Sequence, residues 1–235
     1  MRVVLLPVLA ISTLSLVAEA PQRFFKGNTH AHSLWSDGND FPEMIMDYYH
    51  RSGYDFAVLS DHNVLADGYR WQSLEKIYGL QRIDGPDAIE KCIKRFGPDW
   101  INWETLDGER GISLKRLDEY RHLFEQPGEF LIIEAEEISD KSAQGPVHIN
   151  ALNLERLVGP LNDAKLSTVQ VMRQLLRTVK LQEEEIGRPI MTHLNHPNFF
   201  WGVTAEGLEA VVEERLFWVY TSHRTIHHQG DTPRP

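Results

Sequence analysis

Histidines in this chain gather at the ends of apolar segments that are typical of β-strands. His30 and His32 lie one residue apart, so on a strand their side chains point to the same face and can hold one ion between them. Imidazoles gathered in this way, with carboxylates nearby, are the ligands of multinuclear metal sites. The histidines in such positions are His30, His32, His62, His148, His193 and His196.

Two aspartates lie close to these histidines in the sequence. Asp37 follows His32 by five residues, in the turn Ser36-Asp37-Gly38, and its carboxylate is within reach of the same cluster. An Asp-Gly turn is also common without any ligand, so the turn alone does not make Asp37 a ligand. Asp61 directly precedes His62, and it is a candidate to orient its neighbour or another ligand without contacting the metal.

An acidic run follows the apolar segment at residues 130–133. It contains Glu134, Glu136 and Glu137, and at least one of these carboxylates emerges where a buried strand ends. An uncompensated carboxylate there would be costly, and coordination of a metal is one way to satisfy it. A carboxylate can also bridge two ions, which an imidazole cannot do. We expect one glutamate, either Glu136 or Glu137, to bridge two ions and the others to form a solvated rim.

These side chains must be positioned by a fold in which strand-like and helix-like segments alternate, which predicts an α/β protein. Polar residues follow the apolar segments, as they do at the carboxyl ends of the strands of a β/α barrel. The sequence has no repeat and no low-complexity linker, which favours one domain. We expect strands near 56–59, 130–133, 147–154, 189–192 and 216–220, and helices near 42–53, 86–96, 113–125 and 167–187.

Composition limits the partners of such a site. The chain has 235 residues, of which 42% are hydrophobic and 25% are charged, and this is enough for a sizeable core. The formal net charge of −10 argues against binding along a nucleic acid, because phosphate backbones are held mainly by Lys and Arg. A small phosphorylated substrate would need a local positive charge, which bound divalent ions would supply. Cys92 is the only cysteine, so no intramolecular disulfide can form.

Residues 1–20 have the pattern of a signal peptide. The charged start is followed by an apolar stretch at 3–17 and then by the small-x-small triplet Ala18-Glu19-Ala20. The apolar stretch is shorter than the ~20 residues that cross a bilayer comfortably, which disfavours a stable membrane anchor unless the signal peptide is retained. Pro21 makes cleavage after Ala20 awkward, which leaves cleavage after Ala18 or retention as alternatives. We therefore expect export to the periplasm or the extracellular space, with residues 21–235 as the mature domain.

Five short motifs, taken together and in order, resemble those of the PHP (polymerase and histidinol phosphatase) domain superfamily, and more closely those of its exported bacterial branch. No single motif is specific, but the combination spans residues 27–202. The motifs are Thr29-His30-Ala31-His32 with Ser36-Asp37-Gly38, Leu59-Ser60-Asp61-His62-Asn63, Glu136-Glu137-Ile138-Ser139, His148-Ile149-Asn150-Ala151-Leu152 and Asn195-His196-Pro197-Asn198.

The resemblance implies a distorted (β/α)7 TIM-like barrel with up to three divalent ions at the carboxyl ends of its strands. It places His30 and His32 on the first ion, with Glu137 rather than Glu136 as the bridge to the second. The remaining ligands that it implies are His148 and His196 on the second ion, and Asp37 and His62 on the third.

The resemblance also separates candidate ligands from candidate supporting residues. His196 is preferred to His193 because the ligand of the superfamily precedes a proline, as His196 does here. His193 and Asp61 are then candidates for a proton donor or for residues that support the ligands, and no catalytic side chain is assigned.

Members of the superfamily also end with an Asp-x-His motif on a final strand, and no such motif occurs before Pro235. We therefore expect a C-terminally incomplete barrel that lacks its last strand or strands and holds fewer than three ions. By the same assignment the first ion loses an aspartate and the third loses a histidine. An open sheet edge would also favour self-association.

The expected function is hydrolysis of a phosphomonoester or phosphodiester by a metal-bound hydroxide. Nitrogen and oxygen ligands without a thiolate suit Zn, Mn or Fe. The expected partner is a small phosphorylated substrate. Two alternatives are an amidohydrolase-like activity at the same site, and a catalytically silent exported metal-binding protein or truncated product.

Overall fold

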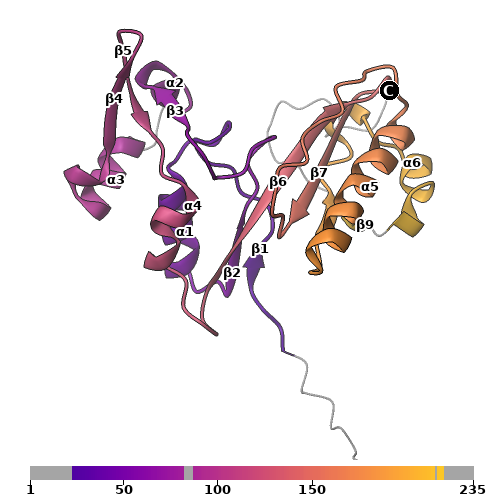
Figure 1. Cartoon of the computed structure of the whole chain (residues 1–235), viewed down its shortest axis with the longest axis horizontal. Helices are drawn as coiled ribbons and strands as arrows, with labels where there is room; N and C mark the ends of the chain where they lie inside the picture. Colours follow the sequence, from indigo (N-terminus) through magenta and orange to yellow (C-terminus); the bar gives the residue numbers. More distant parts are fainter. Residues whose placement is uncertain (1–22, 82–86, 215, 220–235) are drawn as a thin grey trace, which may run out of the picture.

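The computed structural model describes residues 23–81, 87–214 and 216–219 of the chain (Figure 1). The predicted signal peptide at residues 1–20 lies outside these ranges. No helix within them has the length and hydrophobicity needed to cross a bilayer.

The main sheet contains six strands in the order β1-β2-β6-β7-β8-β9. Strands β1, β2 and β6 run parallel, β7 is antiparallel to both β6 and β8, and β9 is parallel to β8. Their bounds are β1 (Gly27–Asn28), β2 (Phe56–Leu59), β6 (Leu131–Lys141), β7 (Pro146–Leu152), β8 (Met191–Leu194) and β9 (Leu216–Val219).

The predicted α/β class is confirmed, and the main sheet curls into half a barrel. The regular alternation of strand and helix was not correct in its middle part. There β6 and β7 pair directly across the short connection 142–145, as antiparallel strands can, without the crossover helix that a parallel pair needs.

The helices that cover this sheet begin and end at the expected signals. In α5 (Thr168–Ile186), Ser167 and Gln170 form a reciprocal capping box, and Gly187 ends the helix with a φ of 66°. In α1 (Pro42–Arg51), the proline occupies the first turn, where its missing N–H costs nothing. The other helices are α2 (Leu74–Gly79), α3 (Ala88–Phe96), α4 (Leu117–Tyr120) and α6 (Ala205–Glu209), with short 3-10 turns at Pro98–Trp100, Arg121–Leu123, Phe199–Trp201 and Val212–Glu214.

The segment between β2 and β6 forms a second, antiparallel sheet that the sequence analysis missed. Its order is β3 (Trp71–Ser73), β5 (Glu109–Ser113) and β4 (Asn102–Leu106). The expected helix at 113–125 forms only in part, because residue 113 ends β5 and helical structure is limited to α4 and the 3-10 turn at 117–123. Asp107 and Gly108 connect β4 to β5 with φ angles of 52° and 83°, which is the Asp-Gly signature of a tight hairpin.

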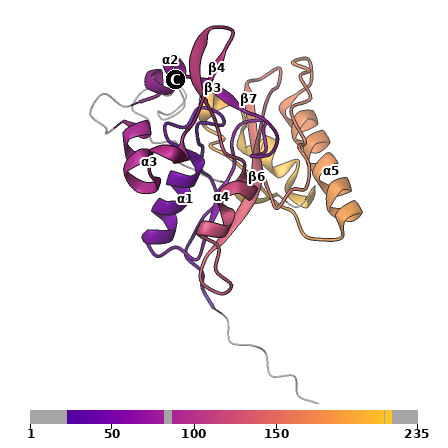
Figure 2. The same cartoon turned by 60° about the vertical axis from the view of Figure 1, so that its left-hand side comes forward.

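Helices α1 and α4 lie on one side of the main sheet and α5 lies on the other (Figures 1 and 2). Two large hydrophobic clusters accompany these helices. The first lies with α1, α3 and α4 and includes Leu34, Trp35 and Leu59. The second lies with α5 and includes Val147 and Leu194. Residues close to candidate ligands in the chain thus belong to both clusters, so the packing of both clusters positions the site.

Candidate metal centre

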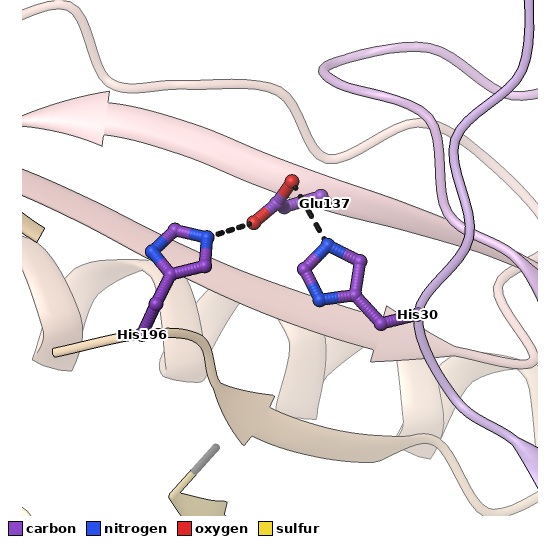
Figure 3. Close-up of side chains that lie close together, drawn as sticks. All are labelled: His30, Glu137 and His196. Carbon is purple, nitrogen blue, oxygen red and sulfur yellow. Dashed lines mark hydrogen bonds and ion pairs between the residues drawn. The ribbon is translucent and has the colours of Figure 1, made fainter. Parts of the chain in front are cut away.

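Glu137 lies at the centre of the histidine cluster and is fully buried in β6. Its Oε2 atom faces three imidazole nitrogens: His32 Nε2 at 2.8 Å, His62 Nδ1 at 3.1 Å and His30 Nε2 at 3.3 Å. Figure 3 shows the carboxylate between His30 and His196, with a different oxygen directed at each ring.

The other oxygen of Glu137 faces a second set of groups. Oε1 lies 3.2 Å from His196 Nε2 and 3.3 Å from His148 Nδ1, and it accepts a hydrogen bond of 2.6 Å from Asn195 Nδ2. The two oxygens of one carboxylate are therefore directed at two different sets of imidazoles. This is the arrangement that a bridging carboxylate requires.

Asp37 extends the cluster on the side of the 33–38 turn. Its Oδ1 lies 2.8 Å from His32 Nδ1, and its Oδ2 lies 3.6 Å from His62 Nε2. His32 thus has one ring nitrogen toward Asp37 and the other toward Glu137. The hydrogen bond from His32 and the nearby imidazole of His62 hold the pKa of Asp37 well below its usual range, so the carboxylate is ionised.

All seven candidate ligands are brought together, and they can be grouped around ions in more than one way, including His30 and His32 with Glu137 as the resemblance implied. Sets of potential ligand atoms within 4.8 Å of one another are His30 with Glu137 and His196, His32 with Asp37 and His62, and His62 with Glu137 and His148. His30 and His32 still meet, with their Nε2 atoms 2.9 Å apart. Their role as metal ligands stays a prediction, and the geometry allows it for each of them.

Unsatisfied atoms in the cluster fit a bound cation. Among the described residues, Glu137 Oε2 and His148 Nδ1 are buried and have no hydrogen bond of good geometry. Such atoms are rare in folded proteins and need a cause, of which a metal ion is one. The donor set of imidazole nitrogens and carboxylate oxygens suits Zn, Mn or Fe.

Protonation in this cluster is set by burial and by the two carboxylates. Burial opposes ionisation of Glu137, but the surrounding imidazoles outweigh it and lower its pKa well below the usual range. Burial by itself would lower the pKa of His32, but the neighbouring carboxylates of Asp37 and Glu137 outweigh burial and raise that pKa to about 10. Burial lowers the pKa of His148, which keeps this imidazole neutral and able to bind a metal.

The side chains of Glu136 and Glu137 lie on opposite faces of β6, because successive residues of a strand point to opposite faces. Glu136 lies on the face away from the histidines, where its carboxylate accepts hydrogen bonds from the backbone N–H groups of Val158 at 2.8 Å and Gly159 at 2.9 Å. Its carboxylate is fully buried rather than part of a solvated rim. Glu136 therefore anchors a loop, and Glu137 alone of the two faces the cluster.

His193 and Asp61 both lie next to the cluster without joining it. His193 is buried, with its Nε2 3.2 Å from the carbonyl oxygen of Thr29. Asp61 accepts hydrogen bonds from the backbone N–H of Ser33 at 2.7 Å and from its hydroxyl at 2.8 Å. Asp61 thus fixes the turn that carries the candidate ligand Asp37, which is the second of the two roles expected of it.

Two buried asparagines, which the sequence analysis did not assign to the site, support Glu137. Asn195 Nδ2 also donates to Asn150 Oδ1 at 2.7 Å, and Asn150 Nδ2 donates to the carbonyl oxygen of Thr29 at 2.9 Å. This chain of amides connects β8, β7 and the strand end that carries His30. The only signal in the sequence was the position of each asparagine close to a candidate histidine.

No family model matches the sequence, and no curated protein matches it. Among solved structures, one similar chain is a two-domain protein from Bacteroides vulgatus that contains a predicted PHP-like metal-dependent phosphoesterase. It has 17% identity and a TM-score of 0.42, and the match covers 83% of this chain and 43% of that one, so this chain spans less than half of its length.

A second similar structure is from Bifidobacterium adolescentis and is provisionally named a metal-dependent phosphoesterase. It has 10% identity and a TM-score of 0.36, and the match covers 83% of this chain and 76% of that one.

Proposed function

We propose that this protein is a metal-dependent hydrolase of phosphate esters. The proposal rests on the buried carboxylate of Glu137, whose two oxygens face different sets of imidazoles. Its Oε2 atom has no hydrogen bond among the described residues. A buried charge in this setting is costly unless cations compensate it.

The charge of the site favours a phosphoryl group over a neutral ester or amide. The candidate ligands include two carboxylates, Asp37 and Glu137, and the rest are imidazoles. Two divalent ions on this set would leave a net charge of about +2, and this charge would attract a phosphate dianion to a protein whose formal net charge is −10. Divalent ions supply Lewis acidity, which lowers the pKa of water and neutralises charge on phosphoryl oxygens.

The chain's own residues hold this arrangement in place. Asn195 fixes one oxygen of Glu137, and the two serines bound to Asp61 fix the turn of Asp37. His62 Nδ1 lies 2.5 Å from the hydroxyl of Ser139, which orients that imidazole. The ligands would therefore be preorganised, as catalysis by positioned ions requires.

Metal content and turnover together test the proposal. We expect the unmodified protein to retain tightly bound divalent ions, measured by mass spectrometry of the metals, and to hydrolyse p-nitrophenyl phosphate or bis(p-nitrophenyl) phosphate. Glu137→Gln and His148→Ala should each lower turnover by about 100-fold or more, because each removes a candidate ligand. Glu134→Gln is the matched control, since Glu134 lies on the same strand but outside the cluster.

Two outcomes would contradict the proposal. Fewer than one tightly bound ion with no turnover on either phosphate ester would favour a catalytically silent protein. Turnover on a p-nitroanilide or p-nitrophenyl acetate, with none on the phosphate esters, would assign the site to the amidohydrolase-like alternative.

A further inference from the structure

The loop that follows the candidate ligand His196 has an unusual backbone. His196, Phe200 and Trp201 have positive φ angles of 25°, 48° and 51°. Residues with a Cβ rarely adopt this conformation, and they keep it only where the surrounding structure enforces it, often at functional sites. Two of the three strained residues are bulky aromatics, and they follow a candidate metal ligand closely in the chain.

Close packing against β7 and α5 enforces this conformation. Gly202 approaches Pro146 so closely that a Cβ on the glycine would come within 2.0 Å of the proline carbonyl oxygen. The Thr168 hydroxyl donates to the carbonyl oxygen of Gly202 at 3.0 Å. A turn hydrogen bond of 2.8 Å from the N–H of Phe199 to the carbonyl oxygen of His196 closes the loop. The aromatic side chains are therefore carried by a fixed backbone.

Phe199 and Phe200 extend the wall of the metal centre outward. The ring of Phe199 lies against the rings of His148 and His196, with centroids 5.7 and 5.4 Å away. Phe200 stands edge-to-face against Phe199, with centroids 4.7 Å apart, and its side chain is 47% exposed. Phe200 is in neither large hydrophobic cluster of the described residues, so core packing does not explain it.

We propose that Phe199 and Phe200, here called the aromatic wall, receive the planar group of the substrate. The site would then prefer phosphoesters of aryl alcohols or nucleosides to alkyl phosphoesters. This inference rests on the proposed phosphoesterase function, because it assigns the substrate class of that site. An aryl ring or a nucleobase can stack on an aromatic side chain, whereas an alkyl group would leave Phe200 exposed to water.

Binding of phosphonates to the Mn²⁺-loaded protein, measured by isothermal titration calorimetry, tests the inference without a chemical step. Phenylphosphonate and methylphosphonate offer similar anionic groups to the ions and differ in the planar ring. We expect Phe200→Ala to weaken binding of phenylphosphonate about tenfold and of methylphosphonate less than about twofold. Phe200→Tyr, which keeps a ring, should bind phenylphosphonate nearly as well as the unmodified protein. Phe25→Ala is the control, since Phe25 is 59% exposed and outside the loop.

The same titrations distinguish an aryl group from a nucleobase, and they can also contradict the role of the aromatic wall. Tighter binding of a nucleoside 5′-phosphonate than of phenylphosphonate would identify a nucleobase, and the reverse would identify an aryl group. Equal affinity for phenylphosphonate and methylphosphonate, or an equal loss of both in Phe200→Ala, would overturn the inference and leave the proposed function standing. If neither bound and no ester were hydrolysed, the proposed function itself would be overturned.

Discussion

Asn195 is a neutral residue that orients the central carboxylate of the candidate metal centre. Its amide holds Oε1 of Glu137 at 2.6 Å and is itself held by Asn150 at 2.7 Å, with both asparagines buried. We expect Asn195→Ala to weaken metal affinity about 10- to 100-fold, because residues that orient a ligand affect affinity on that scale. Titration of the metal-free protein with Mn²⁺ or Zn²⁺ measures this directly.

The control for Asn195 is another asparagine that bonds to backbone. Asn153 Nδ2 donates to the carbonyl oxygen of Pro189 at 2.8 Å, outside the cluster. Asn153→Ala should leave metal affinity unchanged. If both substitutions lowered affinity equally, Asn195 would have no special role in orienting Glu137.

The buried carboxyl group of Glu43 should make the stability of the protein depend on pH, independently of the metal centre. It is fully buried in α1, where burial raises its pKa from 4.5 to about 6. A raised carboxyl pKa means that the protonated form favours the folded state, so this contribution to stability is lost as the pH rises from about 4.5 through 6. Near pH 7.5 the cost is about 2 kcal/mol, from a difference of about 1.5 pKa units.

Glu43→Gln should therefore be more stable than the unmodified protein by about 2 kcal/mol near pH 7.5, with the difference nearly gone at pH 4.5. The amide oxygen can still accept the Trp100 Nε1–H, which lies 2.8 Å from Glu43 Oε1. Urea unfolding of both proteins at several pH values in EDTA measures the difference. Glu90→Gln, at an exposed position of α3, should show no such trend, and a constant difference across pH would refute the assignment.

At the residue scale the sequence singled out the residues that cluster around Glu137 but not the asparagines that support them. His30 and His32 were found from their strand spacing, and the acidic run indicated a glutamate, which the resemblance then narrowed to Glu137. The contact of Asn195 with Glu137 joins residues 58 positions apart, and no local pattern encodes it. For Asp61 the sequence left two roles open, and the contacts with Ser33, 28 positions away, favour support of another ligand over support of His62.

Among the elements, the turn at residues 33–38 positions the candidate ligands His32 and Asp37. Gly38 is needed there because a Cβ would come within 2.3 Å of the carbonyl oxygen of His32 and 2.6 Å of the Ser33 nitrogen. Gly38→Ala must push the turn outward and separate His32 from Asp37. We expect a loss of about 1–3 kcal/mol in stability and fewer bound ions, measured by unfolding and by metal analysis.

Gly79→Ala is the matched control for this turn. Gly79 is the last residue of α2, and a Cβ on it would have no atom within 4 Å, so alanine should be tolerated or slightly stabilising. Unchanged metal content in Gly38→Ala would show that the turn does not hold an ion.

The elements differ in how far their own sequences determined them. The helix at α5 carries its capping box, apolar stripe and terminal glycine in one continuous segment, and its prediction is confirmed. Strand β6 was predicted only for its apolar start, because Glu134, Glu136 and Glu137 do not resemble a buried strand. The carboxylates of Glu136 and Glu137 are accommodated by partners from β7, the loop at residues 158–159 and the segment after β8, which lie far away in sequence.

At the scale of the whole molecule, the sequence predicted an α/β protein but not the order of its strands. The antiparallel β6–β7–β8 pairing and the separate sheet of β3, β5 and β4 depend on which edges meet, and alternation of segments does not specify this. Residues close to the candidate centre in the chain belong to both large clusters, because Ile138, next to Glu137, is in the second cluster and Leu59, near His62, is in the first. Metal ions bound there would join the two halves.

Removal of metal should therefore lower the stability of the whole domain. Ions that bind only the folded state add about 4 kcal/mol when their free concentration is 1,000 times the dissociation constant. For a chain of 235 residues this corresponds to a rise in Tm of about 10 °C. Calorimetric unfolding with saturating Mn²⁺ or Zn²⁺, and again after EDTA, measures the shift. Glu137→Gln should abolish most of it, because the bridging carboxylate is shared by both sets of imidazoles. A shift of the same size in Glu137→Gln would place the stabilising ion elsewhere in the molecule.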